Sequence, residues 1–216
     1  MFKSKHGLKN KKVLITCGPT WVALDAMRVI SNQATGELGF ILAKEFRKAG
    51  CKVTLLAGPT IQPRHLTSIE MKRFHFFHEL DHLIKKELKS RFDIFVHCAA
   101  VSDYQLKSNF QNKISSGLKR LKLQLVPTAK IINKIKRLSP HTFLVGFKLE
   151  SFLNKDNLRK KVAKLFINAR CDLVVANVLK SHYTGFIFNK NLEVLAKANS
   201  RLELAKRLIH SLKNQL

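Results

Sequence analysis

Apolar residues follow two patterns along the chain: short continuous runs, and longer segments in which they recur every three or four residues. The continuous runs, bounded by glycine, proline or polar residues, predict strands. They lie at residues 12–17, 52–57, 71–76, 92–100, 142–147 and 171–178. The helical spacing predicts helices at residues 36–49, 79–90, 129–137, 158–170 and 200–215. A hairpin is expected from residues 186–188 and 192–195, on either side of a short polar turn.

Strands that alternate with helices indicate an α/β fold. We expect a Rossmann-like, doubly wound, mostly parallel sheet with helices on both faces, a long flap and a C-terminal hairpin. The polar stretch from Tyr104 to Gln124 is long for a loop, and loops of that length are usually functional. The expected organisation is a basic N-terminal extension at residues 1–11, followed by one domain at 12–216 with its flap at about 104–125.

The sequence predicts no membrane-spanning helix, because it has no run of 18 or more apolar residues. The basic N-terminus is followed by an apolar stretch, residues 13–17, that is too short for a signal peptide. The four cysteines, Cys17, Cys51, Cys98 and Cys171, are far apart, which is typical of small buried residues in a reducing compartment. We therefore expect a soluble, cytoplasmic protein.

Positive charge dominates the composition of the 216 residues. Forty Lys and Arg against 14 Asp and Glu give a formal charge of +26. Such an excess indicates phosphate-bearing partners, although a lysine-rich composition with solvated faces produces the same number. Residues 104–149 contain no acid but ten Lys and Arg, which favours polyphosphate. A nucleic-acid groove would look similar, but Phe110 is the only aromatic residue between Tyr104 and Phe143.

The first strand is followed by Gly18, and the next helix opens with Gly36 and Gly39. Glycines and free helix N–H groups at this place in an α/β sheet are typical of phosphate sites, although the same glycines occur in ordinary turns. The fingerprint GxGxxG is absent, which argues against an NAD(P)-dependent reductase.

His75, His78 and His82 have spacings that a metal site could use, but no further Cys or His stands beside them, so a metal site is disfavoured.

Three polar residues, Asp25, Arg28 and Asn32, stand between the first strand and these helix glycines. Arg28 would suit a bidentate contact with phosphate or carboxylate, and Asn32 an oxyanion. The alternative is an Asp–Arg pair that only holds the loop. The fourth strand ends in small residues followed by Asp103, which could bind Mg²⁺ or a sugar hydroxyl, and Lys113 follows in the flap.

Taken together, these segments resemble the phosphopantothenate–cysteine ligase (phosphopantothenoylcysteine synthetase) family of coenzyme A biosynthesis, in its stand-alone form. The resemblance spans about residues 12–212. It is carried, in the family's order, by residues 18–20, 25–32, 36–39, 99–104, 113–116, 146–150 and 172–177.

This resemblance implies an enzyme that uses CTP or ATP to activate 4′-phosphopantothenate as an acyl-nucleotide, which cysteine then attacks to form 4′-phosphopantothenoylcysteine. It implies Mg²⁺ carried mainly by the nucleotide, with no confident protein ligand, and no flavin. It also implies a homodimer with the flap near the partner subunit, and neither a membrane nor a nucleic-acid partner. The residues implied are Lys113, Asn32 and Arg28 for catalysis; Gly18, Ala99, Ala100, Asp103, Phe147 and Lys164 for the nucleotide; and Gly36, Gly39 and Asn32 for the substrate.

The chain departs from the family pattern at two places. Ser115 and Ser116 stand where many bacterial members, fused to a decarboxylase, have lysines, so the choice between CTP and ATP stays open. Ala34 and Thr35 replace a usual Ser-Ser pair. We expect a separate protein to carry the decarboxylase. The alternative hypothesis is a nucleotide- or nucleic-acid-binding protein on a degenerate ligase scaffold.

Overall fold

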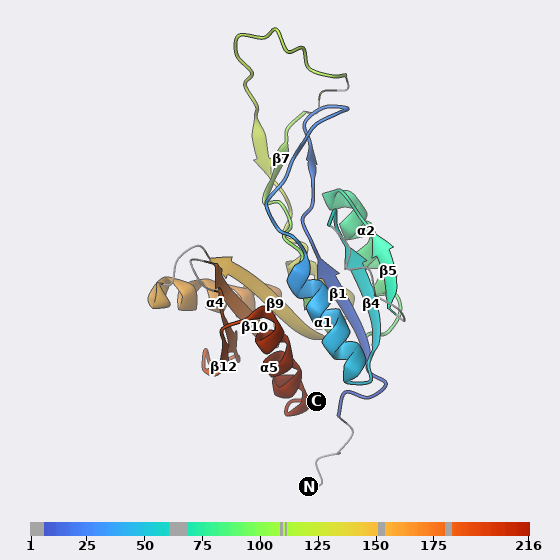
Figure 1. The fold of residues 1–216 in the computed structure, drawn as a ribbon, viewed down its shortest axis with the longest axis vertical. Coiled ribbons are helices and arrows are strands. Elements are labelled where there is room, and N and C mark those ends of the chain that lie inside the picture. The colour runs from blue at the N-terminus through green and yellow to red at the C-terminus, as the bar shows by residue number, and fades with distance from the viewer. Residues whose placement is uncertain (1–6, 61–68, 109, 111, 151–153, 180–182) are drawn as a thin grey trace.

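A computed structural model describes residues 7–60, 69–108, 110, 112–150, 154–179 and 183–216. Its centre is an eight-stranded sheet with the order β12-β11-β10-β9-β6-β1-β4-β5 (Figure 1). These strands are β1 Lys12–Cys17, β4 Lys52–Ala57, β5 Glu70–Arg73, β6 Ile94–His97, β9 Phe143–Glu150, β10 Leu173–Leu179, β11 Tyr183–Phe188 and β12 Val194–Ala198.

Six neighbouring strands, from β10 to β5, are parallel, and the antiparallel pairings of this sheet are those of β11 with β10 and with β12. Along the chain the sheet grows from β1 outward through β4 to β5, then resumes on the other side of β1 with β6, β9 and β10. This is the doubly wound order, and its reversal of winding lies between β1 and β6. The predicted fold class is confirmed, including its C-terminal hairpin, which joins the main sheet through β11 and places β12 at its edge.

Helices cover both faces because side chains alternate along each buried strand. Val13 and Ile15 of β1 belong to the core under α1 (Glu37–Lys48) and α5 (Arg201–Lys213). Leu14 points the other way, into a second core under α2 (Phe77–Glu87), α3 (Ile132–Leu138) and α4 (Lys155–Ala169). Leu8, within the predicted N-terminal extension, is buried in the first core. None of the described helices is long and apolar enough to span a membrane.

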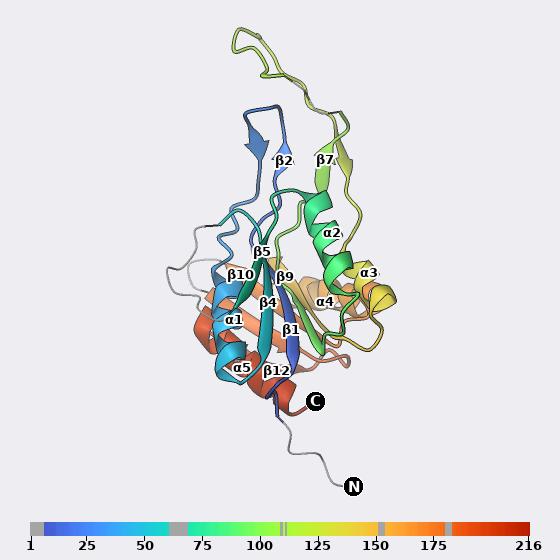
Figure 2. The same cartoon turned by 90° about the vertical axis from the view of Figure 1, so that its right-hand side faces the viewer.

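Two hairpins project together from one end of the sheet and form what we call the arm (Figures 1 and 2). One pairs β2 (Val22–Ala23) with β3 (Val29–Ile30), and the other pairs β7 (Tyr104–Leu106) with β8 (Leu125–Pro127). The second hairpin carries the predicted flap. Neither hairpin was expected as strands, because segments of two or three residues are too short for an alternating pattern to be visible.

Several predicted boundaries were wrong, for local reasons. The strand expected at 92–100 ends at His97, since the following residues leave the main sheet to contact the loop after β1. The helix expected at 79–90 begins at Phe77, because the Glu79 carboxylate accepts the backbone N–H groups of His75 and Phe76 and caps the first turn. The hairpin strands lie at 183–188 and 194–198 instead of 186–188 and 192–195.

Gly39 allows α1 to pack directly against the end of β1. A Cβ atom at this buried position would lie 2.1 Å from Cys17 Cβ, which neither backbone can relieve without moving. We expect Gly39→Ala to lower the free energy of unfolding by about 3 kcal/mol, at the upper end of overpacking effects. Gly117→Ala is the control, since its Cβ would meet nothing closer than 3.8 Å. Urea unfolding measures both, and equal stability of the two variants would contradict this packing role.

Candidate functional site

The loop after β1 and the loop after β6 are hydrogen-bonded to each other beyond the ends of their strands. The Ala100 N–H donates to the Gly18 carbonyl at 2.9 Å, and the Thr20 N–H donates to the Ala100 carbonyl at 3.2 Å. These loops lie at the carboxyl ends of neighbouring parallel strands, where the winding of the sheet reverses. Doubly wound folds bind their ligands at this place. We call residues 18–20 and 99–103, with Asn32, the switch-point group.

Two buried threonines fix the backbone of residues 99–102 through their hydroxyl groups. Thr16 Oγ1 accepts the Ala99 N–H at 3.2 Å and lies 2.9 Å from His97 Nδ1. Thr20 Oγ1 accepts the Ser102 N–H at 2.8 Å. Burial lowers the pKa of His97 to about 4, so this ring is neutral at physiological pH. Sequence reasoning gave no role to Thr16, Thr20 or His97 as supports, because the sequence does not show which distant group a polar side chain will meet.

Asn32 connects this group to the segment that leads into α1. Its Nδ2 donates to the Ala100 carbonyl at 2.8 Å, and its Oδ1 accepts the Ala34 N–H at 3.1 Å. A primary amide has two N–H donors, so one stays available to a ligand. The structure therefore places Asn32 beside Ala99 and Ala100, with a spare donor at an exposed position.

Gly18 and Gly36 come together although 17 residues separate them. Both have positive φ, 80° and 75°, and a Cβ on either would lie 2.7 Å from Thr60 Cγ2. This crowding and the backbone conformation both require glycine. Gly36 directly precedes α1, whose first N–H groups favour an anion.

Asp103 and Phe147 complete this end of the sheet. Asp103 is exposed and pairs with Lys130 at 2.5 Å, and its carbonyl accepts the Thr128 N–H at 2.9 Å. Phe147 is half-buried on β9, one residue beyond the pairing of Gly146 with His97. The Lys130 contact was not expected, and it shows that the segment before α3 helps to position Asp103.

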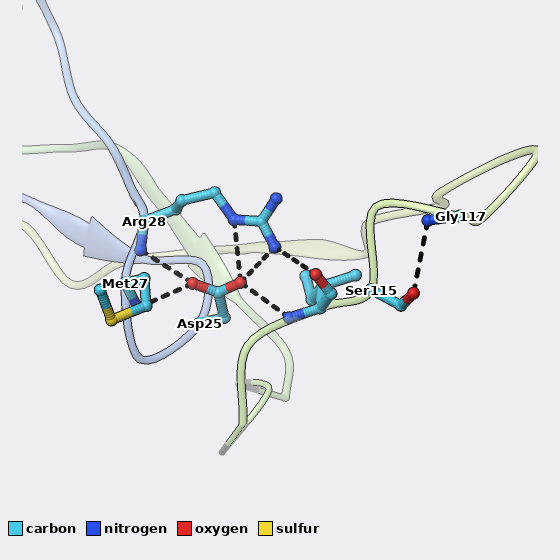
Figure 3. A network of polar contacts seen from close by, with 6 residues as sticks. Asp25, Met27, Arg28, Ser115 and Gly117 are labelled. Atoms are coloured by element: carbon cyan, nitrogen blue, oxygen red, sulfur yellow. Dashed lines mark hydrogen bonds and ion pairs between the residues drawn. The ribbon is translucent and has the colours of Figure 1, made fainter.

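A buried carboxylate connects the two hairpins of the arm (Figure 3). Asp25 lies in the turn between β2 and β3, and its side chain is fully buried. It accepts the backbone N–H groups of Met27 and Arg28, both at 2.8 Å, and that of Ile114 in the flap at 3.0 Å. The Arg28 guanidinium donates to this carboxylate and, at 2.9 Å, to the Ile114 carbonyl.

These bonds, led by the Arg28 side chain and followed by the Ile114 N–H, hold the pKa of Asp25 well below its ordinary value. The structure therefore contains the Asp–Arg pair that holds a loop. It extends that pair across the arm, because Ile114 is anchored through both its N–H and its carbonyl. The neighbouring Lys113 is thereby brought to a defined position, which spacing along the sequence alone did not indicate.

The acid-free stretch of the sequence divides into two parts in the structure. Three lysines at and within α3 pair with carboxylates from elsewhere: Lys130 with Asp103, Lys134 with Asp81 and Lys136 with Asp172. The cations of the flap have no ion-pair partner within the described residues: Lys107, Lys113, Lys119, Arg120 and Lys122. Within residues 104–149 the cations without an ion-pair partner among the described residues therefore lie mostly on the arm, where an external anion would meet them.

The predicted site residues fall into separate groups. The structure brings Gly18, Asn32, Ala99 and Ala100 together at the switch point, while Arg28 and Lys113 lie on the arm. Two other predicted residues lie in neither group. Gly39 is packed against Cys17, and Lys164 is exposed in the second half of α4. Lys164 lies about 14 Å along α4 from the first residue of that helix, at 1.5 Å per residue.

The described residues contain no group of three His, Cys, Asp or Glu side chains that could hold a metal ion. His75 and His78 are separated by Phe76, which stacks on His78 with centroids 5.9 Å apart. His75 instead contacts Trp21, with ring centroids 5.2 Å apart. The histidine spacing noted in the sequence thus corresponds to aromatic packing.

Comparison with known proteins places this geometry in a family. Residues 8–214 match the family model described as the DNA/pantothenate metabolism flavoprotein C-terminal domain. The chain is 36% identical to the Coenzyme A biosynthesis bifunctional protein CoaBC of Thermococcus kodakarensis, covering 97% of this chain and 52% of the relative. It is 35% identical to the CoaBC of Borreliella burgdorferi, covering 88% of this chain and 47% of that relative. The chain thus spans about half the length of these relatives.

A solved structure has the same fold. It is the DNA/pantothenate metabolism flavoprotein from Streptococcus pneumoniae, with a TM-score of 0.85 and 26% identity. The match covers 95% of this chain and 100% of that one. The agreement extends over the whole fold.

Replacing the buried carboxylate of the arm tests its role. Asp25→Asn keeps the shape but removes the charge that Arg28 and the Ile114 N–H stabilise, so we expect lower stability at pH 7 and faster hydrogen exchange at Ile114. Because the folded-state pKa of Asp25 lies below its ordinary value, its contribution is present above about pH 4 and is lost as the pH falls further. The gap between variant and wild type should therefore narrow from pH 4 to pH 2.5.

Urea unfolding at pH 7, 4 and 2.5 measures this gap. Asp156→Asn, an exposed residue in the first turn of α4, is the control and should leave Ile114 exchange unchanged. A gap that is the same at all three pH values would show that the Asp25 charge does not stabilise the arm.

Proposed function

The chain belongs to the family of the DNA/pantothenate metabolism flavoprotein C-terminal domain, and we propose that it is the ligase of coenzyme A biosynthesis that joins 4′-phosphopantothenate to L-cysteine. The product is 4′-phosphopantothenoylcysteine. The observation that supports this most directly is the agreement between the family match, which covers residues 8–214, and a switch-point group with a spare amide donor and glycine loops. Residues 12–216 form the ligase domain of this proposal.

In the first step, a carboxylate oxygen of phosphopantothenate attacks the α-phosphorus of a nucleoside triphosphate, CTP or ATP. The bond from that phosphorus to the β-phosphate bridging oxygen breaks, and pyrophosphate leaves. Negative charge accumulates on the phosphate oxygens, which a cation and N–H donors stabilise. Lys113 supplies the cation, Asn32 supplies its spare N–H, and Gly36 allows the phosphates to approach the first turn of α1.

In the second step, the cysteine amine attacks the acyl carbon of the acyl-nucleotide. The C–N bond forms, the C–O bond to the nucleotide phosphate breaks, the amine loses a proton and the nucleoside monophosphate leaves. The tetrahedral oxyanion requires a donor, for which Asn32 and Arg28 are the candidates. Ala99 and Ala100 leave space for the nucleotide, Asp103 faces the ribose, and Phe147 lies against the base.

The triphosphate would carry Mg²⁺ in this scheme, and the ion would supply further positive charge against the phosphate oxygens. The described residues contain no group of three His, Cys, Asp or Glu side chains that would hold the ion without the nucleotide. Asp103 is an exposed carboxylate at the switch point that could provide one ligand, after release from Lys130. The proposed reaction requires no flavin.

Replacing Lys113 tests the reaction and the role of the flap. With phosphopantothenate, cysteine, Mg²⁺ and either CTP or ATP, the wild-type protein should release pyrophosphate. Lys113→Gln should lower kcat by about 10²–10³-fold, the usual effect of losing one group that stabilises transition-state charge. Its stability should not change, because Lys113 has no partner within the described residues.

Lys119→Gln is the matched control, as another unpaired flap lysine, and should keep turnover within a few-fold of wild type. No pyrophosphate release by the wild type with either nucleotide would refute the ligase. Equal loss in both lysine variants would show that the flap acts through its total charge.

We also propose that the protein is a homodimer that pairs through the arm. Apolar side chains gather there with unusual exposure: Met27 (74%), Val29, Ile30, Tyr104, Phe110, Leu118, Leu121, Leu123 and Leu125. Exposed apolar side chains concentrated on one projecting segment are typical of an interaction site. A second copy is the occupant that fits the proposal, because the arm separates Lys113 from its own switch-point group and a partner's arm could supply it.

Light scattering after gel filtration should give twice the chain mass of 24.7 kDa. The double variant Val29→Glu with Leu125→Glu should shift the protein to monomer, because burying two unpaired carboxylates at an interface is costly. Ile167→Glu is the control, since Ile167 is 75% exposed on α4. A wild-type monomer at micromolar concentration, or a dimer that both variants retain, would contradict pairing through the arm.

A further inference from the structure

A large cavity lies on the other side of β1 from the switch-point group. Its volume is about 830 Å³, within the range of small-molecule sites. It is bounded by α1 and by the residues that follow β4 and β5, and Trp21 forms part of its wall. None of the residues assigned above to catalysis, nucleotide or substrate lines it, so the proposed ligase leaves this volume without a role.

One wall of the cavity is aromatic. Trp21 lies against His75 with ring centroids 5.2 Å apart, and its backbone N–H donates to the His75 carbonyl at 2.7 Å. The edge of Phe76 supports Trp21 from behind, at 6.4 Å. The indole is only half-buried, so part of its surface remains free for stacking. Phe40, which is 3% exposed, contributes further apolar surface.

The charged groups of the cavity are mainly cationic. Lys44, on α1, has no hydrogen-bond or ion-pair partner within the described residues. Arg73, at the end of β5, also lines the cavity, and its guanidinium donates to the Gly58 carbonyl at 3.3 Å. Among the described residues that line the cavity, Glu37 supplies the single carboxylate, and it lies 3.5 Å from Arg201. An anion at Lys44 and Arg73 would therefore be favoured.

We propose that this cavity is a second ligand site that binds a nucleoside monophosphate, with its base against Trp21 and His75 and its phosphate at Lys44 and Arg73. Aromatic rings favour a planar base, and two cations favour a phosphate. The crevice of a doubly wound sheet extends to both sides of the point where the winding reverses, and dinucleotides occupy both halves. The switch-point group uses one half, and this cavity is the other.

The amide-rich chain of phosphopantothenate fits the cavity less well. Such a chain needs several neutral donors and acceptors, whereas the described part of the lining offers, apart from the rings, only the side-chain hydroxyls of Thr35 and Thr60. The proposal therefore assigns the cavity to a nucleotide and not to a second copy of the substrate.

Trp21 is the only tryptophan of the chain, so its fluorescence reports on this cavity. The probes are adenosine monophosphate, adenosine and inorganic phosphate, each titrated into the full-length protein without other substrates. We expect saturable quenching by adenosine monophosphate, with at least tenfold weaker binding of adenosine and of phosphate, because each lacks half of the contacts. No saturable quenching by adenosine monophosphate would overturn the proposal.

Two matched variants of α1 locate the site. Lys44→Ala should weaken adenosine monophosphate binding about tenfold, the equivalent of one charged contact. Lys48→Ala, one turn further along and paired with Glu45 at 2.6 Å, should leave it unchanged. Both should keep wild-type pyrophosphate release. Equal weakening in both variants would overturn the assignment.

The variant Asp103→Asn distinguishes nucleotide binding in this cavity from nucleotide binding at the switch-point group. Quenching by adenosine monophosphate should persist in this variant, because Asp103 does not line the cavity. If quenching is lost, Trp21 is reporting on a nucleotide at the switch point, and the second site does not exist. The binding result is independent of whether the protein proves to be a ligase.

Discussion

The reversal of winding at β1 is the constraint on which the rest of the molecule depends. Once β4 and β6 lie on opposite sides of β1, the loops at their carboxyl ends diverge and leave a crevice outside the sheet. The backbone bonds of Ala100 with Gly18 and Thr20 close the floor of that crevice, and Gly39 lets α1 pack against the end of β1. The switch-point group and the cavity near Trp21 are the two sides of this one feature.

The arm holds a cationic flap away from the sheet, and this requires a stabilising contact of its own. Two-stranded hairpins are marginally stable alone, and here one buried carboxylate joins two of them. Asp25 is fully buried, yet it is paired with Arg28 and accepts three backbone N–H groups, so its charge is compensated. Ile114 is thereby anchored, and the unpaired flap lysines stay directed outward, where their mutual repulsion is screened by solvent or relieved by an anionic ligand.

The net charge of +26 has more than one origin in the structure. Lysines at and within α3 are neutralised by carboxylates that are distant in sequence, such as Asp81 and Asp172. Those of the flap are not, and Lys44 stands alone beside an aromatic cavity. The net charge is therefore no single feature: part of it is neutralised inside the fold, and part of it is exposed on the flap and at Lys44.

The sequence by itself determined the α/β class, the parallel sheet and the family resemblance, because these depend on local periodicity and on short motifs whose residue types are visible in one dimension. It also pointed to Asn32, Ala99 and Ala100, which the fold does bring together. Only the tertiary structure decided that Asp25 reaches Ile114, that Thr16 and His97 support Ala99, and that Lys113 lies on an arm apart from the switch point. Those contacts join residues about 70 to 90 positions apart, and no periodicity in the chain encodes which distant partner a buried polar group will meet.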